Sequence, residues 1–488
     1  MKKIILFLGV MLAFAACSSD KIEVQDPQTG LQTDGQDEII KVNINIERAG
    51  FSGTKASVKS AFADDDVVFI FFKGIDAPKY MEMKYDAAGG TWTATAKNSL
   101  IGTDLSGAAD KKMTAVYLPY GSGMTVEASG DDFVFSGDAY CGFFLTAELQ
   151  DYTYEADVLS GNLYLEVPAL SNASDKYVHF DVSGFTPGNS YEFYQEFVKP
   201  ISFASVSASG VLTKTEGTAG DPITGYQDGS MMSFSGILVA SAVGAEKDYD
   251  FSVDDLTSSI IYTRFVEDKT LSGGQYIGIG NISSWTATPY VDLGLPSGKK
   301  WATCNLGAAN AESAGGYYAW GETATKPNYS WSTYTTLGNG TSKKVKKYCA
   351  TGHTTYWVGD GAPDNILELE KVDDVAYATL HGNWSMPTKA DFEELLDTKN
   401  YCDWAWQAEG TKGYWVSKKD DSSKKIFLPV TGIYTGASRG SVNEGFYWSK
   451  TLATDNSYKA VIMQITSAQH RTVGYDRFYS GVIRPVFK

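Results

Sequence analysis

Few residues in this chain are suited to catalysis or to metal binding. Four histidines occur in 488 residues, and none stands in a Ser/His/Asp or metal-binding phrase. The five cysteines are far apart, and the lack of a Cys-x2-Cys pair argues against a zinc site. Cys349 and His353 have ligand-like spacing, but two residues do not make a site. The sequence therefore predicts a protein that is not an enzyme and has no cofactor or metal.

Two short segments carry side chains suited to contacting a ligand. One is a cationic run that would contact acidic glycans, and the other is a pair of tryptophans that would point the same way on a strand and stack on sugar rings. Each has a structural interpretation that stays open, namely a solvated loop for the lysines and core packing for the tryptophans. The run contains Lys343, Lys344, Lys346 and Lys347, and the pair is Trp404 and Trp406.

The N-terminal segment has the residue pattern typical of an export signal. Lys2 and Lys3 precede the apolar run Ile4–Phe14, which is too short to span a bilayer as a stable helix. Two alanines then lead to Cys17, an arrangement that resembles the lipobox of bacterial lipoproteins. The resemblance implies cleavage before Cys17 and acylation of that residue, which holds a protein durably when several chains are attached. Cleavage after Ala15, giving a soluble secreted protein, is the alternative.

The signal peptide would cover residues 1–16, and a lipidated flexible tether would cover 17–37, a polar stretch unable to form a core. The predicted location is the outer membrane or cell surface, with the lipid anchor as the membrane contact.

Charge divides the rest of the chain. The formal net charge is −17, and residues 1–288 carry 19 Lys+Arg against 38 Asp+Glu, whereas 289–488 carry 22 against 20. Nine of the 11 tryptophans follow Pro289, so both the charge balance and the tryptophan content of the chain change near residues 285–290. This is the expected main domain boundary. The acidic balance argues against a nucleic-acid partner, because such proteins need cations to displace counterions.

The acidic part is rich in strand patterns. Residues 40–47 alternate strictly between apolar and polar, which is typical of a half-buried strand, and 67–72 are continuously apolar, as in a central strand. Many short strands separated by turn residues indicate β-sandwiches. Further strands are expected at 92–96, 114–119, 133–135, 162–167, 176–182, 233–240, 260–263 and 274–279.

The order of these features resembles the fimbrillin-like surface lipoproteins of Bacteroidales. The matching phrases are Glu47-Arg48, Thr54-Lys55-Ala56, residues 65–69, residues 114–120 and residues 271–276. The resemblance implies two tandem transthyretin-like β-sandwiches, at 38–160 and 161–281. In that family an arginine-specific protease removes the first strand of some members, and a strand from another subunit then fills the groove.

Arg48 is the expected position of such a cut. It is the only arginine before Arg264 and directly follows the alternating strand. A cut there would separate the folded part from Cys17, so anchoring and polymerising would compete. An exposed arginine at a strand end is the alternative interpretation.

The C-terminal part predicts a mixed α+β module. Thr388 would cap a helix with Asp391 as its capping-box partner, Phe392 and Leu395 would face inward, and 373–380 would form a second helix. The phrases at 290–308, 315–322, 382–396, 427–432, 445–449 and 481–486 resemble the major paralogous domain first described in Fibrobacter. That resemblance covers 290–488, after a linker at 282–289, and implies a C-type-lectin-like fold.

The expected fold class is therefore mainly β with an α+β C-terminal module. The lectin tripeptides for calcium and sugar are missing, and no cysteine stands in a formylglycine-type phrase. The expected function is a non-enzymatic, lipid-anchored adhesin, or an accessory or tip subunit of a fimbria. Partners would be other fimbrial subunits, through strand addition, and a glycan or host-protein ligand. A surface glycan-binding lipoprotein that captures polysaccharide is the alternative.

Overall fold

The computed structural model describes residues 40–48, 52–53, 62, 64, 66–75, 79–96, 100–118, 125–136 and 144–488. The predicted signal peptide, the tether, Cys17 and the phrase Thr54-Lys55-Ala56 lie outside these residues. Of the described residues, 49% are in strands and 7% in helices, so the predicted mainly β fold class is confirmed.

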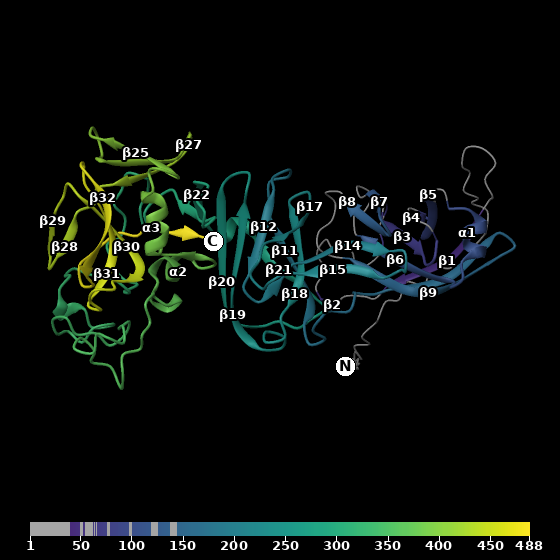
Figure 1. Ribbon diagram of the computed structural model, residues 1–488, viewed down its shortest axis with the longest axis horizontal. Coiled ribbons are helices and arrows are strands. Elements are labelled where there is room, and N and C mark those ends of the chain that lie inside the picture. The colour runs from purple at the N-terminus through teal and green to yellow at the C-terminus, as the bar shows by residue number, and fades with distance from the viewer. Residues whose placement is uncertain are drawn as a thin grey trace, which may run out of the picture. The chain divides into compact units, whose positions relative to one another are not determined.

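The described chain forms two compact units (Figure 1). The first contains the described residues up to Pro187, together with 197–246 and 270–281. The second contains 188–196, 247–269 and 282–488. Segments of the predicted second sandwich, at 188–196 and 247–269, therefore belong to the unit that holds the C-terminal module. The three consecutive domains stay a prediction.

Among the described residues, three sheets build the first unit. The largest has the order β1 (Lys41–Arg48), β10 (Val158–Leu165), β9 (Leu145–Glu155), β6 (Lys112–Leu118), β3 (Val67–Phe72), β4 (Tyr80–Asp86) and β5 (Thr91–Ala96). The second has β13 (Val198–Lys199), β18 (Met231–Leu238), β11 (Lys176–Ser183), β21 (Gln275–Asn281) and β2 (Ser52–Gly53), with β17 (Tyr226–Asp228) on β18. The third has β15 (Leu212–Glu216), β14 (Ile201–Ser207), β8 (Asp132–Ser136) and β7 (Thr125–Ser129). The helix α1 (Gly102–Gly107) and the short β16 (Ile223–Thr224) complete it.

The continuous apolar run of β3 has a direct structural cause. All six of its residues are buried, because the strand lies inside the sheet and both faces of the sheet are covered. Val68, Ile70 and Phe72 enter one hydrophobic core. Val67, Phe69 and Phe71 enter another. The predicted central strand is confirmed.

The second unit has one long sheet and three small ones. The long sheet includes β12 (Tyr191–Gln195), β19 (Glu246–Asp255), β20 (Ile260–Thr270), β22 (Thr286–Asp292), β23 (Lys300–Ala302), β33 (Val486–Phe487) and β24 (Trp384–Ser385). The small sheets are β25 (Cys402–Gln407), β26 (Gly413–Lys418) and β27 (Asp421–Pro429); β28 (Ile433–Thr435) and β29 (Ser438–Gly440); and β30 (Gly445–Leu452), β31 (Lys459–Ile465) and β32 (His470–Asp476). The helices are α2 (Val375–Leu380) and α3 (Lys389–Leu396), with 3-10 turns at Ile282–Ser284, Trp331–Thr333 and Lys371–Asp373.

The segment expected to be a linker, 282–289, is part of the second unit's structure. Its end begins β22, which pairs antiparallel with β20 from Ile260↔Pro289 to Thr263↔Thr286. Ile261 of β20 and Tyr290 of β22 belong to one buried cluster with Trp384 and Phe487. The C-terminal module therefore shares a sheet and a core with β20.

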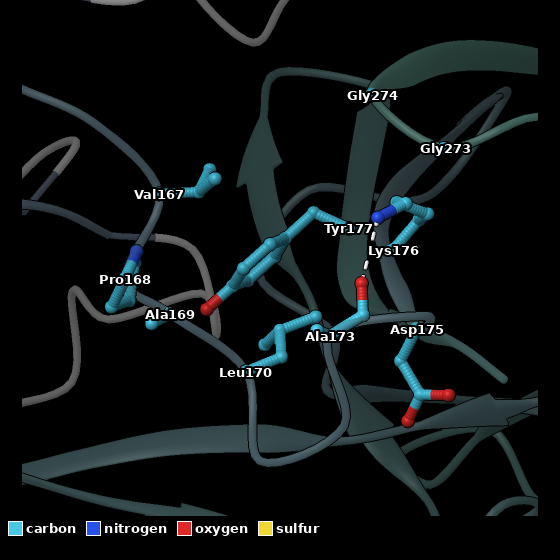
Figure 2. Close-up of a pocket in the computed structure, with 10 residues that line it drawn as sticks. All are labelled: Val167, Pro168, Ala169, Leu170, Ala173, Asp175, Lys176, Tyr177, Gly273 and Gly274. Carbon is cyan, nitrogen blue, oxygen red and sulfur yellow. Dashed lines mark hydrogen bonds between the residues drawn. The ribbon is translucent and has the colours of Figure 1, made fainter. Parts of the chain in front are cut away.

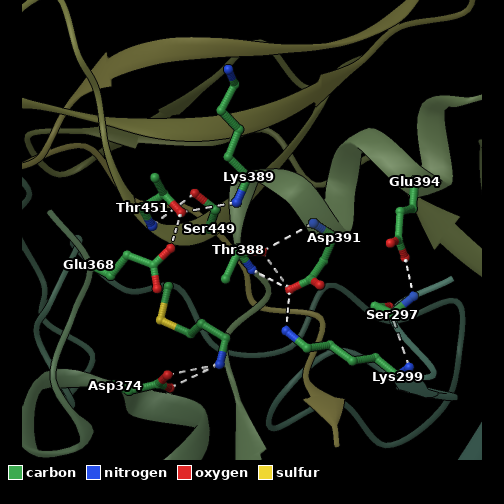
Figure 3. Close-up of polar contacts among 11 residues, drawn as sticks. Ser297, Lys299, Glu368, Asp374, Thr388, Lys389, Asp391, Glu394, Ser449 and Thr451 are labelled. Atoms are coloured by element: carbon green, nitrogen blue, oxygen red, sulfur yellow. Dashed lines mark hydrogen bonds and ion pairs between the residues drawn. The ribbon is translucent and has the colours of Figure 1, made fainter. Parts of the chain in front are cut away.

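The predicted cap of α3 is confirmed (Figure 3). The Asp391 backbone N–H donates to the Thr388 Oγ1 (3.1 Å), and the Thr388 N–H donates to the Asp391 carboxylate (2.6 Å). The Lys299 ammonium adds an ion pair with Asp391 (2.6 Å). Phe392 and Leu395 are buried, as the sequence predicts.

Asp374 begins α2 and also holds the strand that follows the helix. Its buried carboxylate accepts hydrogen bonds from the N–H groups of Ala376 (3.0 Å), Tyr377 (3.2 Å) and Met386 (2.9 Å). Burial raises the pKa of Asp374, although these hydrogen bonds favour its charged form.

Replacing Asp374 with alanine should lower the free energy of unfolding of the second unit by about 2 kcal/mol, since it removes a helix cap and leaves the Met386 N–H buried without an acceptor. Chemical denaturation followed by tryptophan fluorescence measures the change. The matched control is Asp360→Ala at an exposed bend, which should change little. Equal stability of the two variants would contradict the role of Asp374.

Candidate functional site

The N-terminal strand β1 is the strongest candidate for a functional element. It lies at the end of its sheet among the described strands and pairs in parallel with β10, from Lys41↔Val158 to Arg48↔Leu165. Ile44 and Ile46, together with Ile40 just before the strand, are at most 1% exposed and belong to the core. The predicted alternation is confirmed, so β1 completes both the edge of the sheet and one side of the core.

Arg48 continues the inward side of this strand. Its side chain is 4% exposed, so the alternative of an exposed arginine is wrong. The guanidinium carbon lies 5.4 Å from the Phe62 ring centroid and 5.6 Å from that of Tyr117. The period-2 rule that points Ile44 and Ile46 inward also points Arg48 inward. A protease can therefore reach Arg48 only after the end of β1 has separated.

The lysines at 343–347 lie in a loop of the second unit, and each ammonium already contacts another group of the chain. Val345, at the centre of the run, is fully buried and anchors the loop. The contacts are Lys343 to the Tyr458 ring (4.9 Å), Lys344 to the Thr355 carbonyl (2.6 Å), Lys346 to the Thr335 carbonyl (2.8 Å) and Lys347 to Glu370 (2.7 Å). A role of these lysines in ligand contact stays a prediction.

Lys347 is the most strongly held of the four. Burial alone would lower the pKa of Lys347, but hydrogen bonds to the carboxylates of Asp373 and Glu370 raise it above its usual range. The Lys347 charge is therefore paired with Asp373, in the 3-10 turn Lys371–Asp373, and with Glu370 just before that turn.

Trp404 and Trp406 lie on the same face of β25, as expected from their spacing. Both are half-buried and pack against a hydrophobic core. The Trp404 ring stacks on His470 (centroids 4.1 Å apart, planes at 12°), and its Nε1–H donates to the Leu395 carbonyl (2.7 Å). One ring face of Trp404 is thus already covered, and Trp406 packs edge-on against Tyr414.

The structure does not bring the two candidate groups together. The lysine run belongs to the hydrophobic cluster around Val345, and the tryptophans belong to the core around α3. Figure 1 shows the green loops of the second unit well apart from β25. A sugar platform at Trp404 and Trp406 stays a prediction.

The cysteines and histidines of the second unit have structural contacts. Cys304, Cys349 and Cys402 are free thiols, and burial raises the pKa of Cys402 to about 12. The Cys349 thiol lies 3.5 Å from the His353 carbonyl oxygen and does not contact the His353 ring. The ligand-like spacing therefore does not produce a ligand pair. Among the described residues, no group of three His, Cys, Asp or Glu side chains is arranged to hold a metal ion.

In the second unit, one Ser–His contact does form. The Ser457 Oγ lies 2.7 Å from the His353 Nδ1, and it also accepts a hydrogen bond from the Ala350 N–H (2.9 Å). Ser457 is fully buried, so a substrate cannot reach its hydroxyl. The pair fixes the loop that follows Cys349 and does not resemble a nucleophile with its base.

Sequence reasoning missed the buried arginines of the second unit. Arg477 and Arg484 are both 0% exposed. Arg477 lies over the Trp320 ring (4.6 Å) and donates to the Lys347 carbonyl (2.9 Å). The available signal was the Arg484-Pro485 phrase near the C-terminus, but its spacing gives no hint of burial.

No described helix has both the length and the apolar character needed to cross a membrane.

Comparisons with known proteins give distant structural likenesses. No protein-family model matches the chain, and no curated protein matches it. A fimbrial protein from Bacteroides ovatus is 11% identical with a TM-score of 0.20, over 92% of this chain and 99% of that one. A candidate cell adhesion protein from Bacteroides fragilis is 11% identical with a TM-score of 0.21, over 51% of this chain and 96% of that one. Likenesses this low carry no argument about this chain.

Proposed function

We propose that this chain is a non-enzymatic, lipid-anchored cell-surface protein that acts as an adhesin or as an accessory or tip subunit of a fimbria. The lipobox-like segment ending at Cys17 supports the anchor. The acidic, strand-rich first unit supports a structural role over a catalytic one.

The edge position of β1 is the observation that carries the proposal. Its loss would leave one edge of β10 unpaired and would uncover the places of Ile40, Ile44 and Ile46 in the core. Both effects are costly until a guest strand repairs them. Burial of three isoleucines is worth roughly 6 kcal/mol before ordering costs, which is a substantial driving force for strand addition.

The buried strand β33 supports a terminal position over a shaft position. Val486 and Phe487 form β33, which lies between β23 and β24 inside a sheet, and both residues are fully buried. A segment built into a core is not free to serve as a donor strand for a neighbour. A subunit of this kind would accept a strand and end the fibre.

Maturation at Arg48 is part of the proposal. We expect Arg48→Lys to abolish release of the anchored protein by an arginine-specific protease, because lysine keeps the charge and the strand position but is not a substrate. N-terminal sequencing of released wild-type protein should give Ala49 as the first residue. Because Arg48 is buried, release should also accelerate when Ile44→Gly loosens β1.

The matched control for the cut is Arg439→Lys in the exposed strand β29, which should leave release unchanged. Released protein that retains Val42–Glu47 would contradict maturation at Arg48.

The anchor has its own test. Cys17→Ala should move the protein from the membrane pellet to the soluble fraction and remove all acyl groups from its N-terminal peptide, as measured by mass spectrometry. The control is Cys304→Ala, which alters a free thiol of the second unit. An exported wild-type protein without any acyl group would contradict the lipid anchor.

A further inference from the structure

The first unit contains a pocket of about 470 Å³, a volume typical of small-molecule sites. Its walls come from the connection between β10 and β11, from the start of β11 and from the turn before β21 (Figure 2). Val167, Pro168, Ala169 and Leu170 supply much of an apolar lining. Sequence reasoning could not find this pocket, because Gly273 and Gly274, on its opposite side, lie about 100 residues further along the chain.

The charged groups at this pocket are already engaged. The Asp175 carboxylate accepts hydrogen bonds from the Lys199 ammonium (2.7 Å) and the Ala240 N–H (2.8 Å). The Lys176 ammonium donates to the Ala173 carbonyl (2.9 Å), as Figure 2 shows. An ionic ligand would therefore find no counter-ion among the lining residues.

The Tyr177 hydroxyl, in contrast to these charged groups, is not hydrogen-bonded within the described part of the chain. Tyr177 is 4% exposed. Figure 2 shows the hydroxyl pointing toward the side of the pocket formed by Pro168 and Ala169. Burial raises the pKa of Tyr177, so at neutral pH it presents an O–H donor. A buried hydroxyl without an acceptor is costly, and a ligand that supplies one recovers that cost.

We propose that this pocket binds a neutral, largely apolar molecule with one hydrogen-bond acceptor, such as an aryl ketone or ester, which accepts from the Tyr177 hydroxyl. A sugar would bring many hydroxyl groups that this lining leaves unpaired, and a plain hydrocarbon would leave Tyr177 unpaired. The site is independent of the proposed surface function.

Acetophenone and cumene make a matched pair of probes, because they are similar in size and differ in that one has a carbonyl oxygen where the other has a methyl group. Ligand-observed NMR titration of the full chain should detect both. Tyr177→Phe removes only the hydroxyl and should weaken acetophenone about tenfold while leaving cumene within twofold of the wild type. The matched control is Tyr434→Phe in the second unit, which should change neither affinity.

A second variant tests the location of the site. Leu170→Trp fills the pocket and should abolish binding of both probes, with circular dichroism confirming that the fold is kept. The proposal is overturned if neither probe binds the wild type, or if Tyr177→Phe weakens both probes equally. It is also overturned if a folded Leu170→Trp variant still binds both.

Discussion

Replacing Arg484 with alanine should lower the free energy of unfolding of the second unit by about 5 kcal/mol, the largest effect of a single substitution expected here. The guanidinium is fully buried and joins three separate segments. Its donors reach the Asn305 side chain (2.8 Å) and the carbonyls of Thr303 (2.8 Å) and Phe427 (2.7 Å). Alanine would leave a cavity and would remove the donor from these acceptors and from the Ala302 carbonyl (3.1 Å), most of which are buried.

The size of the Arg484 effect should depend on the shape of the substitute. Burial lowers the pKa of Arg484 to about 10, so the group stays charged at neutral pH. Arg484→Lys keeps a charge but reaches fewer acceptors, and it should lose about half as much stability as Arg484→Ala. Arg484→Met fills the volume but satisfies none of the acceptors, so it should lie between the two.

Chemical denaturation with tryptophan fluorescence measures these losses, since ten of the 11 tryptophans lie at or after Trp285. The matched control is Arg439→Ala, an exposed arginine of the same unit, with an expected change below about 0.5 kcal/mol. A loss of similar size for Arg439→Ala and Arg484→Ala would contradict the role of Arg484.

The second large effect concerns the pH dependence of the first unit. His179 of β11 is fully buried, stacks on Tyr276 (4.9 Å) and hydrogen-bonds to Ser235. Burial, aided by the positive charge of Arg48, lowers the pKa of His179 to about 3. The unfolded chain binds a proton at His179 below pH 6.5, whereas the folded chain does not, so this group destabilises the fold as pH falls from about 6.5 to 3. The contribution lost between pH 7 and pH 4 is about 3 kcal/mol.

Asp181, on the same face of β11, acts in the opposite direction. Burial raises the pKa of Asp181 to about 6, although a hydrogen bond from Ser233 favours its charged form. The folded state therefore takes up a proton at Asp181 before the unfolded state does. Its contribution to stability is fully present below pH 3.8 and is lost as pH rises through about 6. Between pH 7 and pH 4 it offsets about 2 kcal/mol of the loss at His179.

Two variants separate these opposing titrations. His179→Gln should remove the loss at low pH, so its stability relative to wild type rises on going from pH 7 to pH 4. Asp181→Asn should show the reverse, because the offset disappears. Hydrogen–deuterium exchange of β11 peptides gives the local free energy at each pH. Identical pH profiles for wild type and His179→Gln would contradict the assignment.

Local patterns predicted many individual elements correctly. The alternation at 40–47 gives β1, the apolar run at 67–72 gives β3, and Thr388 with Asp391 gives the start of α3. Each depends on residues within a few positions of one another, so the periods of strand and helix suffice to predict them. The same patterns did not find β12 or β19, whose residues mix polar and apolar positions and are buried by distant strands.

By itself, the sequence determined the mainly β class, the first strand and the capped start of α3, because these depend on composition and short-range spacing. The tertiary structure alone decided that Arg48 is buried, that β20 joins the sheet of the C-terminal module, and that the Tyr177 hydroxyl faces a pocket without a hydrogen-bond partner among the described residues. These outcomes depend on which distant segments meet, and that is settled by the packing of whole sheets. The alternation points Arg48 toward the inner face of its sheet, but no local pattern records whether rings from other parts of the chain will cover it.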